Sequence, residues 1–313
     1  MKKDLTIKKH MSFRKRFCKD FVRNKALYLM FIPVLIYFII FCYGPMYGIL
    51  MAFQDYSPQK GILESEWVGF ENFIRFFNSP SFSVLLKNTL TISFSTLIFG
   101  FPAPILLALL LNEVKSVKVG RVVQNITYLP HFISMVVVCG MVTMFTNDTG
   151  VVGMLYNAVT GSTGNMLNNP DNYLPIYIIS NIWKEVGWGS IIYLSALLSI
   201  DDSLYEAAEI DGAGRWKQTL HITLPSIVPT IVIMLILRAG QIMSVGYEKV
   251  LLLQNTANID VSEVISTFVY KRGIIDASYS YSAAVSIFNN VINLTLLITT
   301  NTISKKLNET SLW

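Results

Sequence analysis

The sequence predicts an all-α, polytopic membrane protein with six transmembrane helices and both termini in the cytoplasm. Of its 313 residues, 52% are hydrophobic and only 14% are charged, and the mean hydropathy is +0.49. Soluble proteins carry charge on roughly a quarter of their residues. Long uncharged runs separated by short polar segments, with basic residues concentrated on alternate segments, indicate the number of helices and their direction.

The first 25 residues form a basic segment. They contain ten Lys and Arg residues against two acidic ones, Asp4 and Asp20, and a long uncharged stretch follows them. Positive charge beside an apolar run holds that end of the chain in the cytoplasm. Nucleic-acid binding is the alternative interpretation of such a run. A cleaved signal peptide is disfavoured, because the following apolar stretch is far longer than a signal core.

The apolar stretch after this segment exceeds the roughly 20 residues that cross a bilayer. We therefore assign residues 26–85 to a first transmembrane helix, at about 27–50, and an outer loop with interfacial aromatic residues. Residues 86–305 are assigned to a five-helix core. The predicted spans of this core lie at about 86–111, 122–146, 172–200, 225–246 and 283–303. Pro102 and Pro104 predict a kink in the second span.

The distribution of basic residues gives the topology. The predicted cytoplasmic segments, which include 112–121, 201–222 and a tail at 306–313, hold 17 Lys and Arg residues when Lys305 at the inner end of the last span is counted with the tail. The predicted outer segments hold six when Lys87 at the outer end of the second span is counted with them. This bias places both termini inside. The outer segments are then 55–82, an irregular loop at 147–171, and 247–282, which we expect to contain a re-entrant or interfacial helix around 261–270.

The cytoplasmic segment at 201–224 is a charged island between two apolar runs. Ser203 with Glu206 three residues later predicts a capping box at the start of a short helix over 203–211. Gly212 and Gly214 predict its end, because glycine accepts the left-handed conformation of a C-terminal cap. Pro225 then begins the next membrane helix, where its missing N–H is tolerated. The island therefore predicts a short surface helix, a tight turn and a new span.

The same island carries a family pattern. Glu206-Ala207-Ala208 is followed after three residues by Gly212, and after nine more by Ile222 and, one residue later, Leu224-Pro225. This pattern resembles the EAA loop of permease subunits of binding-protein-dependent ABC importers. The context at 207–213 is similar to the carbohydrate branch that includes the maltose permease subunits. The alternative is an ordinary amphipathic connecting helix. The resemblance covers about 26–305.

The resemblance implies one membrane half of an importer for a carbohydrate, an oligosaccharide, in a bacterial cytoplasmic (inner) membrane. It implies four kinds of partner: a homologous permease subunit in a heterodimer, two ATPase subunits, an extracytoplasmic solute-binding protein, and the lipid bilayer. The residues that it assigns to ATPase coupling are Glu206, Ala207, Ala208, Asp211, Gly212, Arg215, Ile222, Leu224 and Pro225. We expect Glu206 to offer a carboxylate to the ATPase, and Asp211 and Arg215 to form a local ion pair across the turn.

Motifs for catalysis are missing from the sequence. A Gly-Lys dipeptide does not occur, so the chain has no Walker A loop. It also lacks HExxH, CxxC and GxSxG patterns, and its three cysteines are scattered. We therefore expect no enzyme activity, no catalytic residue, no metal site and no nucleic-acid binding. ATP and Mg²⁺ would be bound by the partner ATPase subunits.

Polar and aromatic residues inside the predicted spans are candidates for the substrate path. They are Asn181, Trp183, Lys184, Glu185, Trp188, Arg238, Gln241, Asn289 and Asn293, and the stretch 181–188 resembles the fourth span of oligosaccharide permeases. Amides and carboxylates hydrogen-bond sugar hydroxyls, and aromatic faces pack on sugar rings. The alternative role of such residues is to hold helices together. Because Glu185 and Arg238 lie at similar depths in their spans, we expect them to form an ion pair.

Two other functions stay open. An ion-coupled secondary transporter would be expected to have several intramembrane carboxylates and inverted repeats. Glu185 is the one acidic residue within the predicted spans, and no repeat is evident. A permease of the same class for glycerol phosphate or a peptide is the other alternative.

Overall fold

The computed structural model describes residues 21, 23–308 and 311. The described chain is mostly helical, which confirms the predicted class, with one short antiparallel strand pair, β1 (Gln54–Asp55) and β2 (Glu66–Trp67). Most of the predicted basic segment, and the end of the predicted tail, lie outside the described residues.

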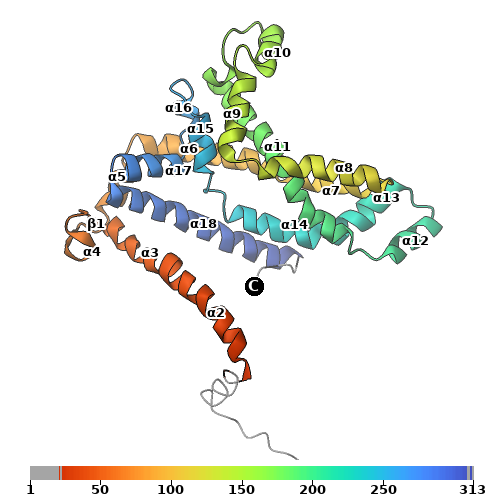
Figure 1. The fold of residues 1–313 in the computed structure, drawn as a ribbon, viewed down its shortest axis with the longest axis horizontal. Helices are drawn as coiled ribbons and strands as arrows, with labels where there is room; N and C mark the ends of the chain where they lie inside the picture. Colours follow the sequence, from red (N-terminus) through yellow and green to blue (C-terminus); the bar gives the residue numbers. More distant parts are fainter. Residues whose placement is uncertain (1–20, 22, 309–310, 312–313) are drawn as a thin grey trace, which may run out of the picture.

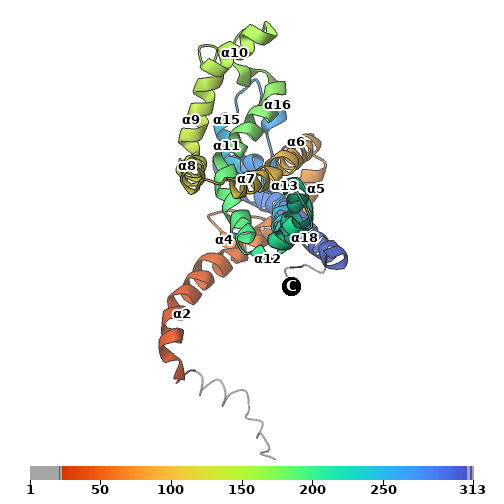
Figure 2. The same cartoon turned by 90° about the vertical axis from the view of Figure 1, so that its right-hand side faces the viewer.

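The first predicted span is a helix whose N-terminal part stands away from the rest of the chain (Figures 1 and 2). It runs from Lys25 to Phe53 and contains α2 (Lys25–Tyr37), the π-helical segment η1 (Phe38–Tyr43), α3 (Gly44–Met46) and the 3-10 segment η2 (Tyr47–Phe53). Its apolar stretch contains no residue that this chain buries. The short helices α4 (Gly61–Glu64) and α5 (Glu71–Phe77) follow.

The second span is longer than predicted and extends from Ser81 to Asn112. It consists of α6 (Ser81–Ser95), the π-helical segment η3 (Thr96–Gly100) and α7 (Pro102–Asn112). Pro102 and Pro104 follow directly after the π segment. The irregular turn therefore occurs where proline removes the backbone donors that a regular α-helix needs.

The third span is broken, contrary to the prediction of one helix over 122–146. α8 (Val117–Tyr128) passes into the 3-10 turn η4 (Leu129–Phe132), and α9 (Met135–Thr146) begins after two extended residues. Pro130 lies in this turn, and the Ser134 side chain caps the new helix by accepting a hydrogen bond from the Val137 N–H. Because of the break, His131 lies in a 3-10 turn and not in a regular α-helix.

The expected loop at 147–171 is also wrong in part, because α10 (Val151–Thr160) occupies its centre, with the 3-10 turn η5 (Met166–Asn168) after it. α11 (Pro170–Leu197) is the central helix and packs on α7, α8 and η4. Gly187 allows this contact, since a Cβ there would overlap the backbone oxygen of Thr127 in α8.

The charged island, predicted to be cytoplasmic, forms α12 (Asp202–Ile210). The following helix begins ten residues before the position predicted from Pro225. It joins α13 (Arg215–Gln218), the π-helical segment η6 (Thr219–Thr223) and α14 (Leu224–Ala239) into one rod of 25 residues. Pro225 is accommodated next to the wide π turn. The rod ends at Ala239, before the predicted end at 246.

The last part of the chain contains α15 (Tyr247–Leu253), α16 (Ile259–Ser262), α17 (Ile265–Tyr270), the π-helical segment η7 (Lys271–Ile275) and α18 (Tyr279–Asn308). α17 falls in the region where a re-entrant or interfacial helix is expected. α18 packs along η2 and α14, and Figure 1 shows these helices side by side.

By length and composition, five helices of the described chain can cross a membrane. They are Lys25–Phe53, Ser81–Asn112, Met135–Thr160, Arg215–Ala239 and Tyr279–Lys306. α11, with 28 residues, is not among them, because Asp171, Lys184, Glu185 and several amides interrupt its apolar surface.

Candidate translocation cavity and coupling helix

A cavity of about 490 Å³ lies between α6, α7, α11, α14 and the segment that leads into α15. Five of the predicted substrate-path residues line it: Asn181, Glu185, Trp188, Arg238 and Gln241. Two charged residues that the sequence argument missed, Glu248 and Lys249, also line it. The cavity therefore combines amide, carboxylate, basic and indole groups in one space inside the helix bundle.

Glu185 forms an ion pair in the cavity wall, but with different partners from the one predicted. Its Oε2 lies 2.8 Å from Nδ1 of His131, and its Oε1 lies 3.6 Å from Nζ of Lys184. Lys184 also donates a hydrogen bond of 2.7 Å to the His131 backbone oxygen. The predicted Glu185–Arg238 pair is wrong. The depth argument assumed a fifth span that continues to 246, whereas Arg238 is next to the last residue of α14.

His131 also positions an aromatic surface. Its ring stacks on the indole of Trp188, with centroids 4.5 Å apart and planes 1° apart. Glu185 holds one side of the imidazole and Trp188 covers its face, so the indole is fixed in the cavity wall. The sequence argument missed His131 because it treated 122–146 as one helix, although Pro130 beside it was a signal for a break.

The two basic residues that line the cavity, Arg238 and Lys249, differ in their contacts. Arg238 has no ion pair or hydrogen bond from its guanidinium to any described residue. Lys249 is buried; its Nζ donates a 2.8 Å hydrogen bond to the Tyr177 backbone oxygen and lies 4.3 Å from the Tyr177 ring centroid. Burial away from water lowers the pKa of Lys249 to about 7. Lys249 belongs to α15, which is not one of the five helices that can cross a membrane.

The other four predicted path residues do not line this cavity. Trp183 faces an apolar pocket of about 410 Å³ formed with α9. Lys184 is buried and does not line the cavity. Asn293 accepts a hydrogen bond from the Met243 N–H at 2.9 Å and donates one to Ser244 Oγ at 2.8 Å, so it ties α18 to the segment after α14. Asn289 Oδ1 is buried without a partner among the described residues.

The candidate coupling helix, α12, lies at one end of the molecule, next to α13 (Figure 1). Its N-terminal cap is Asp201, whose carboxylate accepts a hydrogen bond from the Ser203 N–H at 3.0 Å. This bond lowers the pKa of Asp201 below its usual range. The predicted capping box of Ser203 and Glu206 is therefore wrong, since the helix begins one residue earlier and Asp201 takes the capping position.

The end of α12 agrees with the prediction for Gly212, whose φ is +74°. The Gly212 N–H donates to the Glu209 oxygen at 3.0 Å and the Ala213 N–H donates to the Ala208 oxygen at 2.8 Å. These two bonds form a Schellman motif, which needs a left-handed residue at this position. Gly214 is not left-handed and instead caps α13.

Side chains attach α12 to the membrane helices. Tyr205 Oη lies 2.9 Å from Thr223 Oγ1 in η6. Arg215 pairs with Glu113 at the end of α7, with 3.4 Å between Nη1 and Oε2. The predicted Asp211–Arg215 pair is wrong, because the Schellman turn leaves Arg215 next to α7. A pocket of about 550 Å³ lies between α12 and this helix end.

The outer surface of α12 is acidic and apolar. Glu206 and Ala207 are exposed and Ala208 is half-buried. The apolar side chains of Leu204 and Ile210 are 48% and 87% exposed. Of the remaining predicted coupling residues, Asp211, Gly212, Arg215 and Pro225 are exposed, and Ile222 and Leu224 are half-buried. α12 therefore exposes both acidic and apolar side chains.

Comparisons with known proteins show that this chain is similar to membrane components of transport systems. The family model for the inner membrane component of binding-protein-dependent transport systems matches residues 100–298, which include α12 and most of the residues that line the cavity. Two Bacillus subtilis (strain 168) proteins are each 46% identical to this chain: Protein LplB, over 93% of this chain and 92% of LplB, and the polygalacturonan/rhamnogalacturonan transport system permease protein YteP, over 96% and 94%.

A solved structure is similar over nearly the whole chain. It is a bacterial alginate ABC transporter in complex with an alginate pentasaccharide-bound periplasmic protein. One of its chains matches with a TM-score of 0.86 and 44% identity, covering 95% of this chain and all of that one. From the family match and these relatives, the chain belongs to the inner membrane components of binding-protein-dependent ABC transport systems and is a permease subunit of that family.

Proposed function

We propose that this chain forms half of the translocation path for an oligosaccharide in an ABC importer and couples that path to separate ATPase subunits through α12. The observation that carries the proposal is the cavity, where Asn181 and Gln241 offer amides and Trp188 offers a fixed indole face. Binding sites for small molecules combine apolar or aromatic walls with a few placed polar groups.

The unpaired arginine of the cavity favours a sugar that carries carboxylates. Lys184 offsets the charge of Glu185, and Glu248 and Lys249 add one charge of each sign to the cavity wall, whereas Arg238 has no acidic partner among the described residues. An unpaired guanidinium binds a carboxylate through two parallel hydrogen bonds. Uronic acid units supply that group. Two of the similar proteins are named for transport of polygalacturonan and of alginate, which are acidic polysaccharides.

We further propose six membrane crossings with both termini in the cytoplasm. α11 is the sixth: it is long enough to cross, Lys184 and Glu185 in its middle contact His131, and Glu185 also lines the cavity, so lipid need not contact these two charges. The proposed assembly holds a homologous permease as a heterodimer partner, two ATPase subunits that bind ATP and Mg²⁺, and a solute-binding protein. The chain itself would carry out no catalysis.

Uptake by cells that express the whole importer tests the proposal. The probes are labelled tetragalacturonate and a neutral galactotetraose. Wild type should import the acidic probe, and Arg238→Gln should reduce its uptake by about 10- to 100-fold, since losing a charged hydrogen bond costs roughly 1.5–3 kcal/mol. Thr302→Ala, on the exposed side of α18, is the control and should match wild type.

The energy source separates this function from an ion-coupled transporter. Uptake should stop on ATP depletion and continue with an uncoupler that leaves ATP intact. Glycerol 3-phosphate and a tetrapeptide serve as competitors, and efficient inhibition by either one, with no effect of galacturonate oligomers, would replace the sugar with that ligand class.

A further inference from the structure

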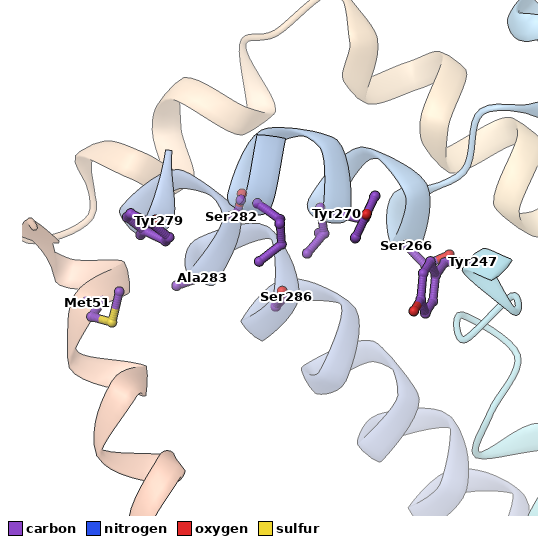
Figure 3. Close-up of a pocket in the computed structure, with 11 residues that line it drawn as sticks. Met51, Tyr247, Ser266, Tyr270, Tyr279, Ser282, Ala283 and Ser286 are labelled. Carbon is purple, nitrogen blue, oxygen red and sulfur yellow. The ribbon is translucent and has the colours of Figure 1, made fainter. Parts of the chain in front are cut away.

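A second hollow, of about 440 Å³, lies next to the cavity on the other side of one short segment. None of the described residues that line it is charged. We call its polar residues the tyrosine–serine trough, which consists of Tyr247, Tyr270, Tyr279, Ser266, Ser282 and Ser286. Figure 3 shows these side chains along α15, α17 and α18, with Met51 of η2 at the opposite end.

The tyrosine rings of the trough are held in place. The rings of Tyr247 and Tyr270 stack, with centroids 5.5 Å apart and planes 25° apart. The ring of Tyr279 meets Tyr56 edge-on at 5.9 Å. The hydroxyls of the three trough tyrosines make no hydrogen bond to other described residues, and the Tyr247 side chain is 48% exposed. The trough therefore presents fixed rings together with free hydroxyl groups.

One hydroxyl of the trough is buried and unsatisfied. Ser282 is 6% exposed, and its Oγ has no hydrogen-bond partner among the described residues. Gly273 leaves space at this point, since a Cβ there would come within 3.0 Å of Ser282 Oγ. Buried polar groups in native proteins are nearly always paired. A missing partner at Ser282 is therefore an independent sign that a polar ligand completes the trough.

The trough and the cavity share one wall. Gly246, Glu248 and Lys249 line the cavity, while Tyr247 between them lines the trough. Ser266 of the trough donates a 2.7 Å hydrogen bond to the backbone oxygen of Val245, which lines the cavity. A chain-like ligand that passes this segment can contact both hollows.

We propose that the trough binds one further sugar unit of the same oligosaccharide whose preceding or following units occupy the cavity. This inference rests on the function proposed above. The apolar C–H face of a sugar ring packs on aromatic rings, and its hydroxyls match the tyrosine and serine hydroxyls, including Ser282. The hydroxyls of Ser282 and Ser286, which make no hydrogen bond to other described residues, favour a polyol over a lipid chain, because a lipid chain would leave them without partners. The trough thereby makes the permease prefer long oligosaccharides over short ones.

Initial uptake rates of digalacturonate and pentagalacturonate by the complete importer test the site. The variant Tyr247→Leu/Tyr270→Leu should raise KM for the pentamer about three- to tenfold, a loss that aromatic contacts account for, and leave KM for the dimer within about twofold. Tyr247→Phe/Tyr270→Phe keeps the rings and should lie closer to wild type. Ser282→Ala should also weaken pentamer uptake alone.

Three results would overturn the inference. Equal changes for both probes, or no change for either, would show that the trough does not sense chain length. Failure of the leucine variant to purify with its partner subunits would show that another subunit fills the trough. Wild type that imports neither probe would remove the proposed function together with the trough, whereas loss of both probes in Arg238→Gln alone leaves that function standing.

Discussion

Glu185 shows how a carboxylate is stabilised within a helix bundle. An isolated charge at this depth is unfavourable, and two neighbours offset it: His131 from the break between α8 and α9, and Lys184 from the preceding position of the same helix. The three residues form a local network that joins α11 to η4. Arg238 belongs to the cavity and not to this network.

The network predicts a specific pattern of coupling. Losses of thermal stability in Glu185→Ala and His131→Ala should be non-additive, with an interaction energy of about 0.5–3 kcal/mol, because each mutation removes the other's partner. The purified complex in detergent gives the measurement. Glu185→Ala combined with Arg238→Ala is the control and should be additive. Additivity in the first pair would contradict the network.

Lys249 predicts a pH dependence of transport. Burial lowers its pKa to about 7, so the amine is charged below that pH and neutral above it. Because an unfolded lysine stays protonated to about pH 10.4, burying the charged form opposes folding most strongly below pH 7, and that penalty fades as pH rises from 7 towards 10.

Uptake of an acidic sugar should change in the opposite direction to stability. It should fall as pH rises through about 7, as the cavity loses one positive charge, and Lys249→Gln should flatten this part of the profile. Neutral sugar uptake measured over the same range is the control. A wild-type profile for the acidic sugar that is flat from pH 6 to 8 would argue against a titrating lysine in the path.

At the scale of elements, α12 is a short helix whose position depends on its last turn. The Schellman motif at Gly212 directs the chain into α13, and the Tyr205–Thr223 contact fixes the other side of α12 against η6. Two contacts at separate points define the angle between α12 and the membrane rod. A partner that moves α12 would therefore move the rod with it.

Two glycines in this turn form a matched test. Gly212→Ala places a side chain at φ +74° and should destabilise the turn by about 1–2 kcal/mol, whereas Gly214→Ala, at φ −71° with open space around the Cβ, should be tolerated. ATPase activity stimulated by transport substrate should drop in the first variant only. Equal activity in both variants would show that the turn does not position α12 for coupling.

Across the whole molecule, the sequence predicted composition-driven features well. The apolar runs located five spans, and the positions of Gly212 and of the island located the surface helix, because these depend on local backbone preferences and hydropathy. It failed wherever a helix departs from regularity. In the two helices with wide π turns near Pro102 and at 219–223, the observed helix ends differ from the predicted ones by up to ten residues. The break at Pro130 places His131 where it contacts Glu185.

These errors in the helix ends explain why the predicted partner of Glu185 was wrong. Pairing of Glu185 was inferred from depth along ideal helices, so an error in the end of α14 became an error in the predicted contact. Residues 247–249 were missed because they follow a span and precede a loop, where no periodic pattern marks them. Their role depends on tertiary packing against Tyr177 in α11, which sequence spacing does not reveal.

The uninterrupted rod from Arg215 to Ala239 carries a geometric consequence. At 1.5 Å per residue its 25 residues measure about 37 Å, so a tilt of about 10° about its Arg215 end moves the opposite end by roughly 6 Å. Arg238 lies at that opposite end. A rotation too small to disrupt the packing of the bundle would therefore displace the guanidinium by about the width of a sugar ring. The rod thus converts a small change of angle at one end into a large displacement at the other.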